Sequence, residues 1–161
     1  MFGGFRKKVT RQTIEMVKQP YAIFQHHHGI PAGFWQDEFV VGFFGSMASM
    51  VALILAKGKL SRTDRGYVLQ ESFSALSNMS GMAIAQRFTE LTMQKPMSAS
   101  FKQGADNGAI ISLAMFGTTA PEDQVMIDAA EQEAARLGLP LPSYLMMTLY
   151  VEELKERFNL T

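Results

Sequence analysis

The strongest pattern along the chain is a long apolar segment in which bulky side chains recur at helical spacing. Apolar residues that recur three and four positions apart lie on one face of an α-helix. In this segment they are Phe39, Phe43, Met47, Met50 and Ile54. The pattern predicts a helix over about residues 35–57, buried at the centre of the fold.

Small residues repeat at four-residue spacing in this segment and in a later one. Gly45 and Ser49 lie four apart, as do Gly104, Gly108 and Ser112. Residues at positions i and i+4 lie one above the other on the same face of a helix. These positions therefore predict that a neighbouring helix can approach closely.

Five or six further helices are predicted from apolar spacing and from residues that begin and end helices. The capping pairs are Ser61 with Asp64, Ser100 with Gln103, and Thr119 with Glu122. The predicted helices cover about residues 6–18, 61–76, 81–94, 100–116 and 119–137, and a last one begins after Ser143. The two segments 61–76 and 81–94 are equally consistent with two helices or one kinked helix.

Pro20 is predicted to end the first helix, because proline cannot donate the backbone hydrogen bond that an interior position needs. Residues 19–34 contain two prolines and two glycines and are predicted to form a loop. Its aromatic residues Tyr21, Phe24 and Phe34 indicate that this loop is held against the body of the protein.

Nothing in the sequence predicts a β-sheet, because no alternating apolar and polar run is sustained. The expected fold is an all-α bundle of five to seven helices in one domain, residues 1–161. Within it, residues 1–34 form a basic N-terminal helix and an aromatic, histidine-containing loop. Residues 35–161 form the helical core around the central helix at about 35–57.

Charge is balanced over the 161 residues, with 15 basic and 15 acidic side chains, but it is unevenly distributed. Residues 1–34 hold five basic residues and one acidic residue, whereas residues 120–161 hold eight acidic and three basic ones. The overall neutrality argues against a nucleic-acid partner, which requires an extended basic surface. The chain has no cysteine, which excludes thiol chemistry and suits the cytoplasm.

Methionine and phenylalanine are abundant, with 12 residues of each. Most are expected in the core, but methionine also lines adaptable binding grooves. This composition favours a protein–protein interaction module with a Met/Phe-rich apolar surface. The residues expected at the partner surface are Phe2, Phe5, Met146, Met147 and Tyr150.

Membrane association is a second hypothesis, and it has two possible routes. Residues Phe39–Ala56 form an uncharged run of about 18 residues, the lower limit for a membrane span. We expect this helix to be covered by its neighbours instead, because the flanking segments are amphipathic. The other route is the basic N-terminus, where Arg6, Lys7, Lys8 and Arg11 beside phenylalanines predict contact with anionic lipid. This places the protein in the cytoplasm or at the inner face of a membrane.

A third hypothesis is a small-ligand or metal-binding protein that uses the histidine loop. The weak candidate ligands are His26, His28 and Glu38. Adjacent histidines point in different directions, and no pair has the three- or four-residue spacing of helical metal ligands. We therefore expect no metal or other cofactor.

No enzyme is predicted either, because nucleophile and phosphate-loop motifs are incomplete. Residues 44–48 lack the second glycine of a nucleophile elbow, and residues 57–61 lack the glycine spacing of a phosphate loop. The three hypotheses rank as interaction module first, membrane-associated subunit second, and ligand- or metal-binding protein third.

Overall fold

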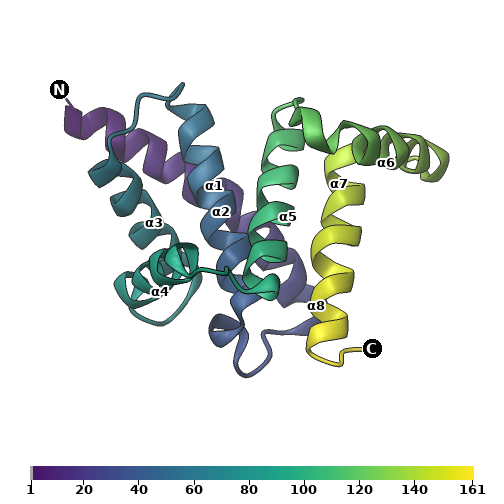
Figure 1. Cartoon of the computed structure of the whole chain (residues 1–161), viewed down its shortest axis with the longest axis horizontal. Helices are drawn as coiled ribbons and strands as arrows, with labels where there is room; N and C mark the ends of the chain where they lie inside the picture. The colour runs from purple at the N-terminus through teal and green to yellow at the C-terminus, as the bar shows by residue number, and fades with distance from the viewer. Residues whose placement is uncertain (1) are drawn as a thin grey trace. The chain divides into compact units, whose positions relative to one another are not determined.

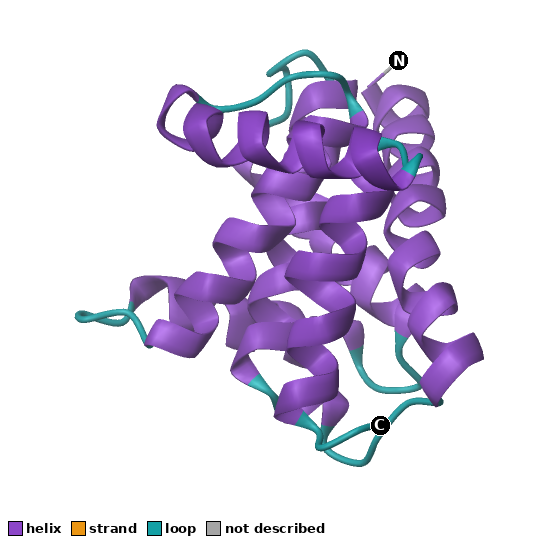
Figure 2. Cartoon of the chain, turned by 90° about the vertical axis from the view of Figure 1, so that its right-hand side faces the viewer, coloured by secondary structure: helices purple, strands orange, loops and turns teal. Residues whose placement is uncertain are grey.

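The computed structural model describes residues 2–161, apart from the side chain of Phe2, and this part of the chain is helical without strands (Figures 1 and 2). The helices are α1 (Phe2–His28), α2 (Glu38–Leu55), α3 (Arg62–Leu76), α4 (Gly81–Met93), α5 (Ala99–Met115), α6 (Gln124–Leu137), α7 (Leu141–Met146) and α8 (Glu152–Arg157). The all-α fold class is confirmed. The chain groups into two compact units, Met1–Ala109 and Ile110–Thr161, which we describe separately.

Helix α2 lies at the centre of the first unit, as predicted. It packs against α1, α3 and α4, and the side chains of Phe39, Phe43 and Met47 are fully buried. Asp37 begins the helix: its Oδ1 accepts a hydrogen bond from the backbone N–H of Val40 at 3.1 Å. Such a cap satisfies one of the four N–H groups that a helix start leaves free.

Helix α1 is longer than predicted, because it passes through Pro20 and continues to His28. The prediction that Pro20 ends the helix was therefore wrong, and so was the predicted loop over residues 19–28. Residues 29–33 are non-helical, as predicted. The helix continues because of packing beyond the proline. Phe24 is fully buried and stacks on Phe34, and Tyr21 stacks on Trp35 with the ring centroids 5.9 Å apart. These contacts outweigh the lost hydrogen bond that usually stops a helix at proline.

Helices α3 and α4 are separate, which settles the question that the sequence left open. Ser61 caps α3 as predicted: its Oγ accepts from the N–H of Asp64 at 3.0 Å and donates to the Asp64 carboxylate at 2.8 Å. Ser80 caps α4 by accepting from the N–H of Ala83. Gly81 then lets the two helices pack closely, since a Cβ there would lie 2.2 Å from the Gln70 carbonyl oxygen.

The residue that caps helix α5 lies two positions earlier than predicted. The side chain of Ser98, rather than Ser100, supplies the cap and accepts from the N–H of Phe101 at 3.1 Å. The Ser98 hydroxyl also donates to the carboxylate of Glu38, the first residue of α2. One serine therefore holds the start of α5 beside the start of α2.

The second unit contains the end of α5, helices α6, α7 and α8, and two other helical segments. A 3-10 turn, Pro121–Asp123, precedes α6, so the predicted cap at Thr119 does not begin that helix. Gly138 ends α6 in a left-handed conformation, as predicted. A π-helical stretch, Met147–Val151, joins α7 to α8, and this last helical run starts at Leu141 rather than after Ser143.

Candidate functional site

An apolar cleft in the first unit lies among α2, α3, α4 and α5. It encloses about 350 Å³. We call it the methionine cleft, and it is lined by Ser46, Ser49, Met50, Leu53, Arg65, Phe88, Thr92, Met97, Phe101, Lys102, Ala105 and Asp106. Ligand pockets in proteins typically measure about 300–1,000 Å³, so this cleft is at the small end of that range.

Glycines let α5 pack directly against α2, and α5 then forms one wall of the cleft. A Cβ at Gly104 would lie 2.1 Å from the backbone oxygen of Phe39, and one at Gly108 would lie 2.4 Å from that of Phe43. No larger residue fits at these positions without moving the backbone. The close approach predicted from the four-residue spacing of the glycines is therefore present.

Helix α4 supplies the opposite wall through the ring of Phe88. A Cβ at Gly45 would lie 2.2 Å from this ring, which therefore sits directly on the α2 backbone. The ring centroid of Phe88 is 5.6 Å from that of Phe101 on α5. Both rings line the cleft, together with Ser46, Ser49, Met50 and Leu53 of α2.

Charged groups lie only at the rim of the methionine cleft. Lys102 and Asp106 form an i,i+4 ion pair at 2.5 Å, and both side chains are exposed. The hydrogen bond to Asp106, and then its charge, raise the pKa of Lys102 above its ordinary value of 10.5, so this amine stays protonated near neutral pH. The Thr92 hydroxyl donates to the carbonyl of Phe88 at 2.8 Å. The cleft thus combines an apolar interior with a polar edge.

Helix α4 also carries two exposed methionines. Met82 is 61% exposed and Met93 is 71% exposed. Met93 directly follows Thr92, which lines the cleft, and Met97 lines it four residues later. Large exposed apolar side chains beside a cleft are typical of a binding surface. This cleft was not predicted from the sequence, because the apolar spacing places Met50 on the buried face of the central helix. The methionine content was the available signal.

The partner-surface residues proposed from the sequence do not gather in one place. The side chain of Phe2 lies outside the described residues, and Phe5, in the first unit, is 44% exposed. In the second unit Met147 is partly exposed and Met146 is half-buried. Tyr150 is fully buried, so it offers no contact surface in this structure.

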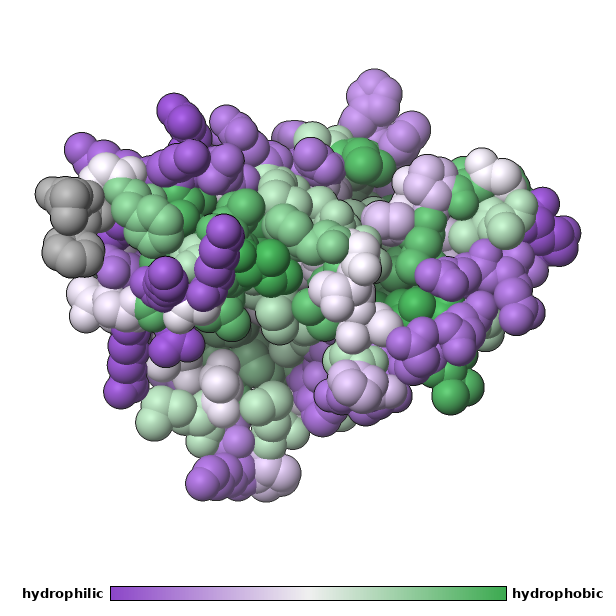
Figure 3. All heavy atoms as spheres, turned by 90° about the horizontal axis from the view of Figure 1, so that it is seen from above, coloured by the Kyte–Doolittle hydropathy of each residue, from purple (hydrophilic) through white to green (hydrophobic). Residues whose placement is uncertain are grey.

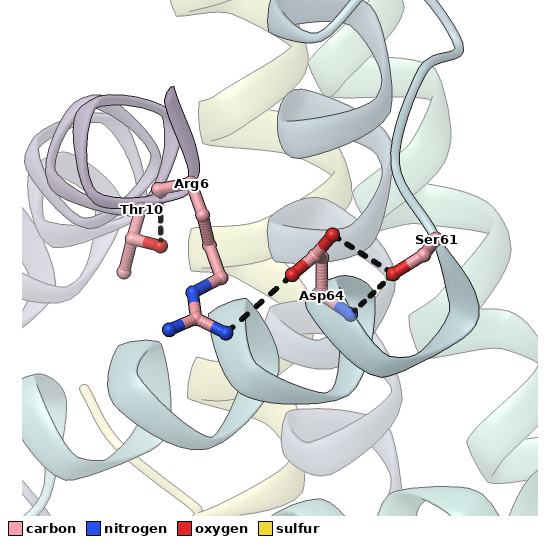
Figure 4. A network of polar contacts seen from close by, with 4 residues as sticks. All are labelled: Arg6, Thr10, Ser61 and Asp64. Carbon is pink, nitrogen blue, oxygen red and sulfur yellow. Dashed lines mark hydrogen bonds and ion pairs between the residues drawn. The ribbon is translucent and has the colours of Figure 1, made fainter. Parts of the chain in front are cut away.

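Of the four N-terminal cations proposed from the sequence, Arg6 contacts α3 and the other three are exposed. Arg6 pairs with Asp64 at 3.6 Å and lies 4.3 Å from the centroid of the Tyr67 ring. Figure 4 shows how Asp64 in turn contacts Ser61, so the cap of α3 and the first turns of α1 share one polar network. Lys7, Lys8 and Arg11 are exposed on the solvent side of α1.

The histidines lie at the C-terminal end of α1 rather than on a loop. His26 and His27 are exposed, and the ring of His28 packs on Phe24 with centroids 5.1 Å apart. Among residues 2–161, no three histidine, aspartate or glutamate side chains are grouped closely enough to hold a metal ion. His26, His28 and Glu38 therefore do not come together as a ligand set.

Helix α2 has the length and composition of a membrane span, and it is the single described helix that does. Sixty-one per cent of its residues are buried inside the protein. This burial agrees with the expected role as a core helix, because its apolar side chains already contact protein.

The chain shows no match to a known protein family, to a curated protein or to a solved structure.

Proposed function

We propose that the protein is a non-enzymatic interaction module that binds an amphipathic helix of a partner protein in the methionine cleft. The observation that carries the proposal is an apolar cleft lined by Met50, Met97 and two phenylalanines. Methionine suits such a surface because its flexible, polarisable side chain adapts to different partners.

A helix is the favoured occupant for reasons of shape and charge. The cleft lies between helices, and docking of the apolar face of a helix into such a groove is a common recognition mode. Its volume accommodates about two or three bulky side chains, which a helix presents one turn apart. Arg65 and Lys102 at the rim favour a partner with acidic residues beside its apolar face. The protein would act in the cytoplasm as an adaptor, chaperone-like protein or subunit of an assembly.

The arrangement of polar groups supports a binding role over catalysis. The amine of Lys102 is kept protonated by Asp106, which makes it a poor nucleophile or base. The Thr92 hydroxyl is used inside its own helix. What the cleft offers a ligand is therefore mainly apolar surface.

Methyl NMR on labelled methionines tests the proposal directly. The probe is a set of amphipathic helical peptides with leucine or phenylalanine at positions i, i+4 and i+7 and acidic residues beside them. We expect saturable shifts at Met50, Met93 and Met97, and none at Met16 or Met147. Binding should disappear in Ser49→Trp, which fills the cleft, and persist in Thr63→Trp, an exposed control on α3.

Two results would overturn the proposal. One is the absence of saturable shifts at the cleft methionines with every peptide. The other is a response of Met50 and Met97 only to small apolar molecules, which would make the protein a ligand-binding one. Circular dichroism of both tryptophan variants establishes that the fold is retained.

A further inference from the structure

The solvent-facing side of α1 carries a line of cations that the methionine cleft does not use. Lys7, Arg11 and Lys18 lie four and seven residues apart and so project from one side of the helix, with Lys8 next to them. We call these four residues the basic face. No ion pair engages any of them among the described residues, and Glu15 is the one acidic residue in α1.

The basic face borders a shallow cleft between α1 and α3. This cleft encloses about 290 Å³ and is lined by Lys7, Thr10, Arg11, Ile14, Glu15, Lys18 and Tyr67. Three cations thus surround a space with apolar and aromatic walls. A basic pocket between helices is suited to an anionic headgroup.

Further cations surround the N-terminal half of α1. Arg6 contacts Asp64 and Tyr67 of α3, and Val9 packs in one cluster with Leu60 and Val68. These contacts hold the α2–α3 connection and the start of α3 beside α1. The connection and the first turn of α3 carry Lys57, Lys59 and Arg62. Figure 3 shows hydrophilic side chains with apolar surface between them around the grey N-terminal residues.

The extent of the basic face favours a lipid headgroup over a nucleic acid. Its four cations span about three turns of α1, and the chain as a whole carries no net charge. A nucleic acid requires an extended basic surface, whereas a few cations around one small cleft suffice for a headgroup.

We propose that the basic face docks the protein peripherally on a bilayer that contains anionic phospholipid. The cations lie at the headgroups, and the cleft between α1 and α3 receives a headgroup phosphate. The proposal is independent of the methionine cleft, since the two surfaces use different residues.

Vesicle co-sedimentation tests the proposal with two compositions, phosphatidylcholine alone and phosphatidylcholine with about 30 mol % phosphatidylserine. We expect binding only to the anionic vesicles, and weaker binding as salt rises. Each cation at the surface is worth about a fivefold change in partitioning. The triple variant Lys7→Gln, Arg11→Gln, Lys18→Gln should therefore bind about a hundredfold more weakly.

A matched control removes the same charge elsewhere. The control is a second triple variant, Lys95→Gln, Arg136→Gln, Lys155→Gln. It lowers the net charge by the same amount without changing the basic face, and it should bind like the native protein. The double variant Phe5→Ser, Ile23→Ser changes exposed side chains on the other side of α1 and should also bind like the native protein. Thermal unfolding of each variant shows that the fold is intact.

Three outcomes would overturn the proposal. The first is no binding of the native protein to anionic vesicles at low salt. The second is equal loss in the triple variant and its control, which would reveal a net-charge effect. The third is tighter binding to a single-stranded oligonucleotide than to anionic vesicles, which would identify a nucleic-acid surface.

Discussion

The contact between α5 and α2 gives a sharp prediction, because it reverses the usual effect of a helix substitution. Replacing glycine by alanine inside a helix normally stabilises a protein by about 1 kcal/mol. At Gly104 the added Cβ would lie 2.1 Å from the Phe39 carbonyl oxygen. We therefore expect Gly104→Ala to destabilise the first unit.

The size of the effect follows from the geometry. Ordinary contacts of a Cβ begin near 3.4 Å, so the two helices must separate by more than an ångström. The obstacle is backbone, which cannot rotate away as a side chain can. Overpacking of this kind costs about 1–3 kcal/mol, and the upper end applies here. After the gain in helix propensity, a net loss of about 2 kcal/mol remains.

Gly66→Ala is the matched control. Gly66 lies inside α3, and a Cβ there meets no atom within 4 Å. Only the helix propensity changes, so this variant should gain about 1 kcal/mol. The two substitutions are chemically identical, yet their free energies of unfolding should differ by about 3 kcal/mol.

Urea unfolding followed by tryptophan fluorescence measures both variants. Trp35 is the one tryptophan of the chain, is nearly buried and lies in the first unit, so its emission reports on that unit. The helix-contact argument would be refuted if Gly104→Ala were as stable as Gly66→Ala. A native-like Gly104→Ala would likewise show that α5 does not lie on the α2 backbone.

Two further predictions concern polar contacts. Ser61→Ala should lower the free energy of unfolding in urea by about 1 kcal/mol, because the α3 cap is lost. Thr63→Ala in the same exposed turn is the control and should change it by less than about 0.5 kcal/mol. Equal effects of the two substitutions would count against the cap. NMR titration should find the pKa of Lys102 above 10.5, and Asp106→Asn should lower it. Since the folded-state pKa is raised, the stabilisation by this pair is present below pH 10.5 and is lost as the pH rises through the pKa of Lys102. An unchanged Lys102 pKa in Asp106→Asn would contradict the assigned contact.

Local rules predicted most elements of the fold, because they act within a few residues of sequence. The Ser61 cap and the Gly138 stop appear where the sequence placed them. Pro20 is the clearest failure. Whether a proline ends a helix depends on what the following residues can bury, and Phe24 packs on Phe34, ten residues further along the chain. Such a partner is set by the tertiary fold and not by local sequence.

The methionine cleft was harder to foresee for a related reason. Helical spacing shows that Met50 and Phe88 lie on apolar helix faces, but not whether the neighbouring helices cover those faces completely. The size of the methionine cleft depends on how closely α5 and α4 approach α2. Gly104 sets the approach of α5, and Gly45 sets that of α4. The basic N-terminus was visible in the sequence, whereas the cations that α3 adds beside it required the fold.

The contacts of α2 also bear on how this protein would meet a membrane. Glycines on α5 contact the backbone of Phe39 and Phe43 in the first half of α2. Ala52 in its second half packs with Val9 and Val68, so both halves of the helix are engaged. Moving it into lipid would exchange these close-packed contacts for acyl chains, which offer no better environment to its apolar side chains. Contact with a bilayer would then fall to α1, whose exposed side is cationic. Binding through α1 would be reversed by salt, whereas an inserted α2 would resist it.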